Sequence, residues 1–220
     1  MDSCCNQAYQ QTFDDASAAK EMKDYLAGGV KKSSRPFLAV LQQLPLRGRT
    51  QLDIGAGIGA MILESFNRGL ATATYVDIAA GYRQTFLQEA TNRELTGQID
   101  AKLGDFTELH ATVDPADLVT LDKVICCYED YEGLVRHSLS KARRWYVYSI
   151  PREVWWVRLV HVVVEKIRKI RGGQFRSFIH PAGKIEAMVE AAGFKMIAMQ
   201  RRREWEVKAF ERVSEVEVLR

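Results

Sequence analysis

The chain has 220 residues, of which 47% are hydrophobic and 27% are charged, and its formal net charge at pH 7 is +3. This composition is enough to bury one sizeable core but leaves little for a second domain. The net charge is too small by itself to indicate a nucleic-acid partner, and no apolar run is long enough to cross a bilayer.

The first residues predict a polar arm in front of the core. They have neither the charged nor the apolar region of a secretion signal, so we expect a cytoplasmic protein. Charged side chains dominate residues 14–24 and offer few core anchors, whereas Gly28 and Gly29 offer a hinge. We therefore expect a mobile lid up to about Gly29, in a chain divided into an arm with covering helices (1–46) and a core (47–220).

A glycine-rich turn follows the first predicted strand. An apolar strand that ends in Asp53 runs directly into Gly55, Gly57 and Gly59, and then into an apolar helix. Glycines adopt backbone angles that a side chain would forbid, and they let a ligand lie against the main chain. A dinucleotide-binding turn has its third glycine one position later, and a carboxylate before the turn would repel a pyrophosphate. The turn therefore favours a ligand that carries cationic groups.

Two later strands also end at carboxylates. Residues 73–78 read as a second strand that ends in Asp77, followed by Ile78. Asp77 lies about twenty residues beyond the glycine turn, where a nucleotide-binding unit places a carboxylate for the ribose hydroxyls. Residues 99–106 read as a third strand that ends in a turn at Asp105. These positions predict further contacts to a nucleoside.

The remaining elements complete a strand and helix alternation. A fourth strand is expected within residues 116–128, which contain Asp122 and Tyr128. Helices are expected over 81–95, 132–142 and 184–192, and strands over 144–150, 194–200 and 205–210. Alternating elements favour a mostly parallel sheet with helices on both faces. Ligands of such sheets bind beyond the carboxyl ends of the strands, so the acidic residues are expected to converge there.

A further helix is expected over residues 152–171, within a helical insertion that spans 152–180. Its apolar residues recur at spacings of three and four and include Trp155 and Trp156. Three interpretations stay open: a helix packed on the core, a lid over the acceptor pocket, or a peripheral membrane contact. The two tryptophans are expected to line an apolar acceptor pocket beside Tyr128.

The cysteines and histidines do not predict a metal site. The cysteines form two adjacent pairs, Cys4-Cys5 and Cys126-Cys127, and neither has the spacing of a zinc or redox motif. The second pair reads as small apolar residues at the end of a buried strand, or as thiols that contact substrate or a soft metal. The histidines are scattered along the chain, without ligand spacing.

Two motifs carry a resemblance to a known family. The D-x-G-x-G-x-G pattern of residues 53–59 resembles motif I of the class I S-adenosylmethionine-dependent methyltransferases. The D-x-V-x-x-D-x-x-I-x-x-Y skeleton of residues 117–128, with the arm at 13–34, is similar to the magnesium-protoporphyrin O-methyltransferase family and its uncharacterised relatives. That family has a histidine where this chain has Cys127, and a thiol is not an ordinary proton shuttle near neutral pH. Porphyrin is therefore a doubtful substrate.

The resemblance implies a Rossmann-like, seven-stranded α/β sheet, mostly parallel with a terminal antiparallel hairpin. It also implies S-adenosylmethionine as the cofactor. By the same resemblance, Asp105 is expected to accept a hydrogen bond from the adenine amino group, and the backbone N–H of Phe106 is expected to face a ring nitrogen. Asp122 contacts the methionine end of the cofactor or caps a turn. Tyr25 belongs to an arm that closes over the cofactor.

These expectations combine into one predicted function and two alternatives. We expect an enzyme that moves the cofactor methyl group by direct displacement to a small, partly lipophilic acceptor, with Tyr25, Tyr128 and His180 near that acceptor. The alternatives are a nucleic-acid or protein methyltransferase and a cofactor-binding module without catalysis. Members that methylate bases or amides often carry an Asn/Asp-Pro-Pro-aromatic loop after the fourth strand, where this chain has Cys-Cys-Tyr-Glu. No nucleic-acid partner is expected.

Overall fold

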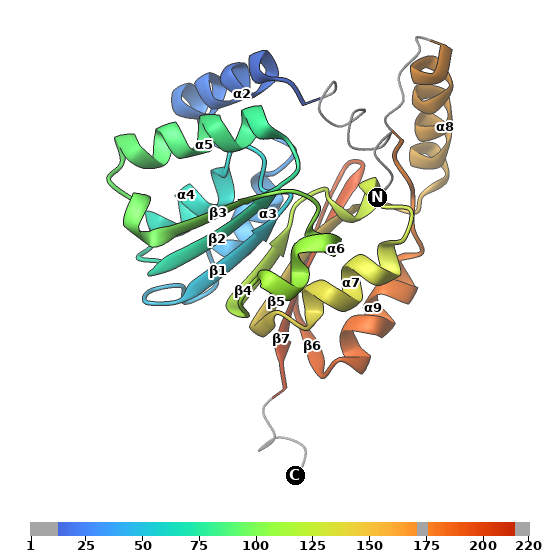
Figure 1. The fold of residues 1–220 in the computed structure, drawn as a ribbon. Coiled ribbons are helices and arrows are strands. Elements are labelled where there is room, and N and C mark those ends of the chain that lie inside the picture. The colour runs from blue at the N-terminus through green and yellow to red at the C-terminus, as the bar shows by residue number, and fades with distance from the viewer. Residues whose placement is uncertain (1–12, 171–175, 214–220) are drawn as a thin grey trace.

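The computed structural model describes residues 13–170 and 176–213, which form a seven-stranded sheet in the order β3-β2-β1-β4-β5-β7-β6 (Figure 1). The strands are β1 Thr50–Ile54, β2 Thr72–Asp77, β3 Ile99–Leu103, β4 Ala116–Leu121, β5 Ala142–Pro151, β6 Phe194–Arg202 and β7 Trp205–Arg212. The first five strands pair in parallel, whereas β7 is antiparallel to both β5 and β6. The predicted sheet, with its terminal antiparallel hairpin, is confirmed.

Helices cover both faces of the sheet (Figure 1). They are α2 Asp15–Gly28, α3 Arg35–Leu41, α4 Ala60–Phe66, α5 Ala80–Asn92, α6 Phe106–Leu109, α7 Tyr131–Leu139, α8 Trp155–Ile170 and α9 Ala182–Ala191. Successive strand residues point to opposite faces, so Leu118 packs in a core with α2 to α5 while Val119 packs in a second core with α6, α7 and α9. Two apolar layers therefore sandwich the sheet and hold the carboxyl ends of its strands in fixed positions.

The N-terminal arm is more firmly anchored than its charge predicts. Ala18, Met22 and Tyr25 are at most 7% exposed and belong to the core that α2 shares with α5. The side chain of Asp14 caps the helix by accepting from the N–H of Ser17 at 2.8 Å. The prediction of few core anchors is wrong. These three residues recur at spacings of four and three, so they form one narrow apolar stripe, which is enough to anchor α2 because it faces a neighbouring helix. Residues 1–12, with Cys4 and Cys5, lie outside the described part of the chain.

Helix α8 is not packed on the core. Val157 is its buried residue, whereas most of its large apolar side chains are exposed, from Trp156 at 36% to Ile170 at 84%. The core-packed interpretation of this helix is therefore wrong, since spacing alone does not say what an apolar stripe contacts. Arg171, predicted as its last residue, lies outside the described residues. Across residues 13–170 and 176–213, no helix has the length and apolar run that a bilayer span needs.

Candidate functional site

A cavity of about 540 Å³ opens at the carboxyl ends of β1, β2 and β4. Its volume lies in the range of small-molecule and cofactor sites. The glycine turn after β1, helix α2, the segment after β4 and helix α8 all contribute to its walls. The predicted residues Asp53, Asp77, Ile78, Phe106 and Asp122 line it together, as expected for side chains that follow neighbouring parallel strands.

The glycine turn adopts the backbone that the spacing predicts. Gly55, Gly57 and Gly59 have φ values of 63°, 57° and 70°, in the left-handed region. A Cβ on Gly57 would meet only the Tyr82 ring, at 3.7 Å, so this glycine leaves the main chain open toward the cavity. Cβ atoms on the other two glycines would overlap side chains of the core, Val124 for Gly55 and Phe86 for Gly59. The turn is thus shaped both for a ligand and for packing.

Asp53 is a buried carboxyl group at the end of β1. It is 2% exposed, and its Oδ1 accepts from the hydroxyl of Thr120 at 2.6 Å. Burial raises the pKa of Asp53 from about 3.8 to about 7, and the nearby carboxylates of Asp122 and Asp77 act in the same direction. A cationic ligand group beside Asp53 would offset both effects. The site therefore suits a ligand with a positive charge at this point.

Asp77 holds the glycine turn in place. One of its carboxylate oxygens accepts from the N–H of Gly57 at 2.7 Å, and the other accepts from the N–H of Ala79 at 2.8 Å. Burial raises the pKa of Asp77, whereas these backbone donors oppose that shift. Asp77 therefore has a structural role at the turn, and its predicted contact to a ribose stays a prediction.

Asp105 has one satisfied and one unsatisfied carboxylate oxygen. Its Oδ1 accepts from the N–H of Thr107 at 2.8 Å, from the Thr107 hydroxyl at 2.9 Å and from the Tyr128 hydroxyl at 2.9 Å. Its Oδ2 is buried and has no hydrogen-bond partner among the described residues. A buried acceptor without a donor is costly, so a ligand N–H is the partner that this atom lacks. An adenine amino group fits that requirement.

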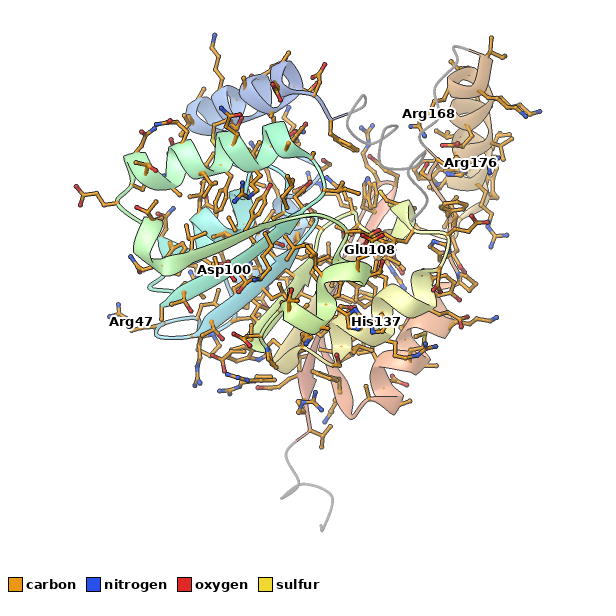
Figure 2. All side chains as sticks on the ribbon, in the orientation of Figure 1. Arg47, Asp100, Glu108, His137, Arg168 and Arg176 are labelled. Carbon is orange, nitrogen blue, oxygen red and sulfur yellow. The ribbon has the colours of Figure 1, made fainter. Side chains whose placement is uncertain are left out.

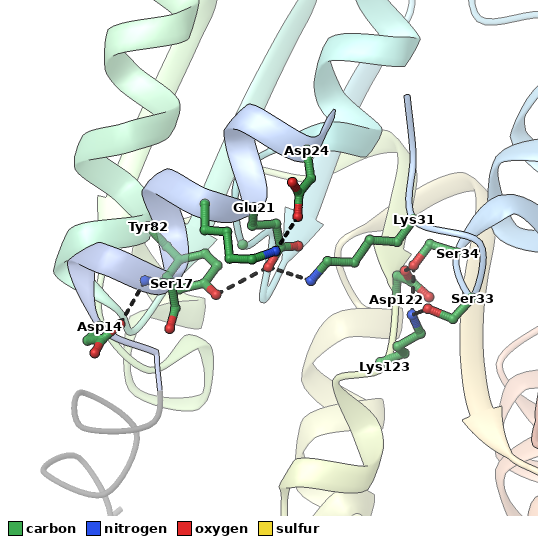
Figure 3. Close-up of polar contacts among 12 residues, drawn as sticks. Asp14, Ser17, Glu21, Asp24, Lys31, Ser33, Ser34, Tyr82, Asp122 and Lys123 are labelled. Atoms are coloured by element: carbon green, nitrogen blue, oxygen red, sulfur yellow. Dashed lines mark hydrogen bonds and ion pairs between the residues drawn. The ribbon is translucent and has the colours of Figure 1, made fainter. Parts of the chain in front are cut away.

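Helix α2 and the segment after it are tied to the end of β4 by hydroxyl groups and lysines (Figure 3). Asp122 accepts from the Ser34 hydroxyl at 2.5 Å and from the Ser149 hydroxyl at 2.7 Å. The ammonium of Lys123 donates to Ser33 at 2.7 Å and to Ser34 at 2.8 Å. Lys31 pairs with Glu21 of α2 at 2.6 Å. Asp122 thus ties the segment after α2 and strand β5 to the end of β4.

The three predicted catalytic residues have different positions. Tyr25 and Tyr128 line the cavity, but His180 lies outside its lining. The Tyr25 hydroxyl donates to Glu64 at 3.0 Å, and burial raises its pKa to about 12, so it stays protonated at neutral pH. Nε2 of His180 donates to the backbone carbonyl of Tyr128 at 2.8 Å, and its ring stacks on Tyr131. His180 therefore positions the segment that carries Tyr128.

The far end of the cavity is mostly apolar. Val157, Val160 and Val164 of α8 line it, together with Trp205, the first residue of β7. Trp155 and Trp156 do not belong to the lining, so the expectation that they form the acceptor pocket is wrong. Trp155 and Trp156 come just before Val157, the first residue of α8 that lines the cavity, and their side chains point in other directions around the helix axis. No motif indicated Trp205 or Lys123, whose ammonium lies 5.5 Å from the Trp205 ring, because their partners are distant in sequence.

Cys126 and Cys127 also line the cavity. They lie in a short 3-10 turn, Ile125–Cys127, beyond the end of β4, rather than at the end of a buried strand. Cys126 is buried and its pKa is raised, first by the neighbouring Cys127 and then by burial, so it stays a thiol. In the described part of the chain, no group of three or more His, Cys, Asp or Glu residues is arranged to hold a metal.

Replacing Asp105 with Ala is expected to weaken binding of S-adenosylhomocysteine by about tenfold or more, because the unsatisfied Oδ2 is removed. Asp130→Ala is the matched control. Asp130 also caps a helix, accepting from the N–H of Gly133 at 2.9 Å, but it is exposed and has no buried oxygen without a partner. Both variants should lose about 1 kcal/mol of stability with the cap. Calorimetric titration that finds equal affinity in the two variants would contradict the role of Asp105.

Comparisons with known proteins agree with this geometry. Residues 52–140 match the family described as "Methyltransferase domain". The structure is similar to magnesium protoporphyrin IX methyltransferase from Synechocystis PCC 6803 with bound S-adenosylhomocysteine, with a TM-score of 0.71 and 18% identity over 94% of this chain and 99% of that chain. A search of curated proteins finds no match.

Two further structures have the same fold. An O-methyltransferase family protein from Burkholderia thailandensis matches with a TM-score of 0.67 and 16% identity, over 93% of this chain and 64% of that chain. An S-adenosylmethionine-dependent methyltransferase from Mesorhizobium loti matches with a TM-score of 0.63 and 12% identity, over 82% of this chain and 98% of that chain. Residues 52–140 therefore match a methyltransferase domain, and the chain has the fold of these methyltransferase structures.

Proposed function

We propose that the protein binds S-adenosylmethionine in the cavity and transfers its methyl group to a small, partly lipophilic acceptor through oxygen, nitrogen or sulfur. The observation that carries this proposal is the division of the cavity into two ends. The glycine turn and the carboxylates Asp53 and Asp77 line one end, whereas valine side chains of α8 and Trp205 line the other. Asp105 is not itself in the lining, but its neighbours Gly104 and Phe106 are, and its Oδ2 is buried without a partner. The first end suits a cationic nucleoside, and the second suits an apolar acceptor.

Three carboxylates would recognise three parts of the cofactor. When bound, S-adenosylmethionine supplies a methyl group made electrophilic by its sulfonium. Asp53 would face the cationic amino acid end, because its buried carboxyl lacks a compensating positive charge. Asp77 would accept from ribose hydroxyls next to the turn that it holds. The unsatisfied Oδ2 of Asp105 would accept from the adenine amino group.

The acceptor end would act by orientation and water exclusion. Val160 and Val164 provide apolar walls. The side of α8 that faces away from the cavity is exposed, so this wall is a single helix thick. Tyr128 lies between the two ends, with its hydroxyl directed to Asp105 at 2.9 Å. A displacement needs the nucleophile aligned and dry, so these residues can supply much of the acceleration without a general base. We further propose that residues 1–46 cover the cofactor, since Glu21 and Tyr25 of α2 line the cavity.

Calorimetric titration tests the cofactor assignment directly. S-adenosylhomocysteine is expected to bind with a dissociation constant of about 1–100 μM, whereas NADH should give no heat, since Asp53 would repel its pyrophosphate. Binding of NADH without binding of S-adenosylhomocysteine would show that the assignment is wrong. A mass-spectrometric screen of phenols, thiols, amines and carboxylates with labelled cofactor then tests the acceptor. Tight cofactor binding with no labelled product from lipophilic acceptors would favour a binding module.

A further inference from the structure

Helix α8 has two apolar sides, and only one of them belongs to the cavity. Val157, Val160 and Val164 face the cavity. Trp155, Leu159 and Val163 follow each other at spacings of four and lie on the other side of the helix, where they are 76%, 57% and 47% exposed. Figure 2 shows the side chains of α8 on a helix that projects from the edge of the molecule. We call the side that bears these three residues and Ile170 the outer face.

The outer face is larger than the scattered apolar residues of an ordinary surface. Trp156, Val162 and Ile167, which are 36%, 48% and 45% exposed, widen it. Contiguous apolar patches on a soluble chain mark an interaction site. Val157, Val160 and Val164 already supply the cavity wall, so the cavity does not explain the outer face.

Basic residues border the outer face. Arg158 and Lys169 are exposed and lie along one edge of it. The exposed Lys166, three residues after Val163, lies on the face itself. The one acidic residue of the helix, Glu165, pairs instead with Arg168 and accepts from the Ser177 hydroxyl at 2.8 Å. The border therefore keeps a positive charge. Tryptophan, aliphatic and basic side chains on one short helix are the composition of an interfacial membrane anchor.

We propose that the outer face of α8 docks the protein on an anionic lipid bilayer, with the helix lying in the plane of the headgroups. Charge complementarity selects this occupant: a second copy would place Arg158, Lys166 and Lys169 against the same residues of the partner in a symmetric pair. An anionic bilayer accepts both the apolar side chains and the cationic border. Because Val160 and Val164 line the cavity from the same helix, docking would place the acceptor end next to the lipid.

Vesicle sedimentation tests the docking without cofactor, so its outcome does not depend on methyl transfer. The full chain is expected to sediment with phosphatidylcholine vesicles that contain phosphatidylserine, and to be released by high salt. Leu159→Glu combined with Val163→Glu should weaken this partition by at least about tenfold, because two charges replace inserted side chains. Tryptophan emission should shift to the blue on vesicles, and this shift should be absent from a Trp155→Phe, Trp156→Phe variant.

The matched control places the same charges on another exposed apolar pair. Ile197 and Met199 of β6 are 44% and 41% exposed, and changing both to Glu should leave vesicle binding unchanged. Thermal unfolding of both double variants checks that their folds are intact. Equal binding to anionic and neutral vesicles, or equal loss in the two double variants, would overturn the proposal. A stable dimer without lipid that the Leu159→Glu, Val163→Glu variant dissociates would overturn it as well.

Discussion

Replacing Gly59 with Ala should lower the free energy of unfolding by roughly 2–5 kcal/mol. Two causes act together. The residue has a φ of 70°, a left-handed conformation that costs a residue with a Cβ about 1–2 kcal/mol. The new Cβ would also lie 2.1 Å from Cδ2 of the Phe86 ring, and this overlap adds about 1–3 kcal/mol. Urea denaturation of the purified variant measures the change.

The ring of Phe86 has no room to move away. It is fully buried and stacks on Tyr75, with ring centroids 4.6 Å apart and planes 9° apart. Truncating it in Gly59→Ala, Phe86→Leu should therefore give back part of the loss. The control is Gly183→Ala in α9, where a Cβ meets nothing within 4 Å and the variant should gain about 0.4–1 kcal/mol. An unchanged urea midpoint in Gly59→Ala would show that the turn is not packed in this way.

The fold and the cofactor end of the site follow from local sequence patterns. The glycine spacing after β1 and the carboxylates at the ends of β1, β2 and β3 are each visible within a few residues. Because parallel strands present their carboxyl ends at one edge, a strand assignment was enough to bring Asp53, Asp77 and Phe106 to one cavity. The terminal antiparallel pair was visible for the same reason, as two apolar runs joined by a short polar turn.

The acceptor end depends on contacts that no local pattern shows. Lys123 donates to Ser33 and Ser34, about ninety residues earlier in the chain, and its ammonium lies over Trp205. The apolar spacing of α8 was visible, but a helix with two apolar sides has the same spacing as a helix packed on a core. His180 was chosen for its chemistry, whereas its hydrogen bond to the Tyr128 carbonyl is a tertiary contact.

Replacing Asp53 with Asn should raise the stability of the protein at pH 8 by about 2–4 kcal/mol. Burial raises the pKa of this carboxyl from about 3.8 to about 7 in the folded state. Between these two values the folded state binds more protons than the unfolded state, so stability falls as the pH rises. The variant lacks this penalty. Its advantage should be absent below about pH 4 and complete above about pH 7, in urea titrations at several pH values.

The same substitution should weaken S-adenosylmethionine and S-adenosylhomocysteine by roughly tenfold to hundredfold, because Asn keeps the shape of Asp53 but not its charge. A cationic ligand group favours the ionised carboxyl, so binding to the wild-type chain near pH 6.5 should release a proton. The heat of binding would then depend on the ionisation enthalpy of the buffer. That dependence should vanish in Asp53→Asn and persist in Asp100→Asn. Asp100 is a suitable control because its side chain is 60% exposed and does not line the cavity. Proton release that survives in Asp53→Asn would place the cationic end of the ligand elsewhere in the cavity.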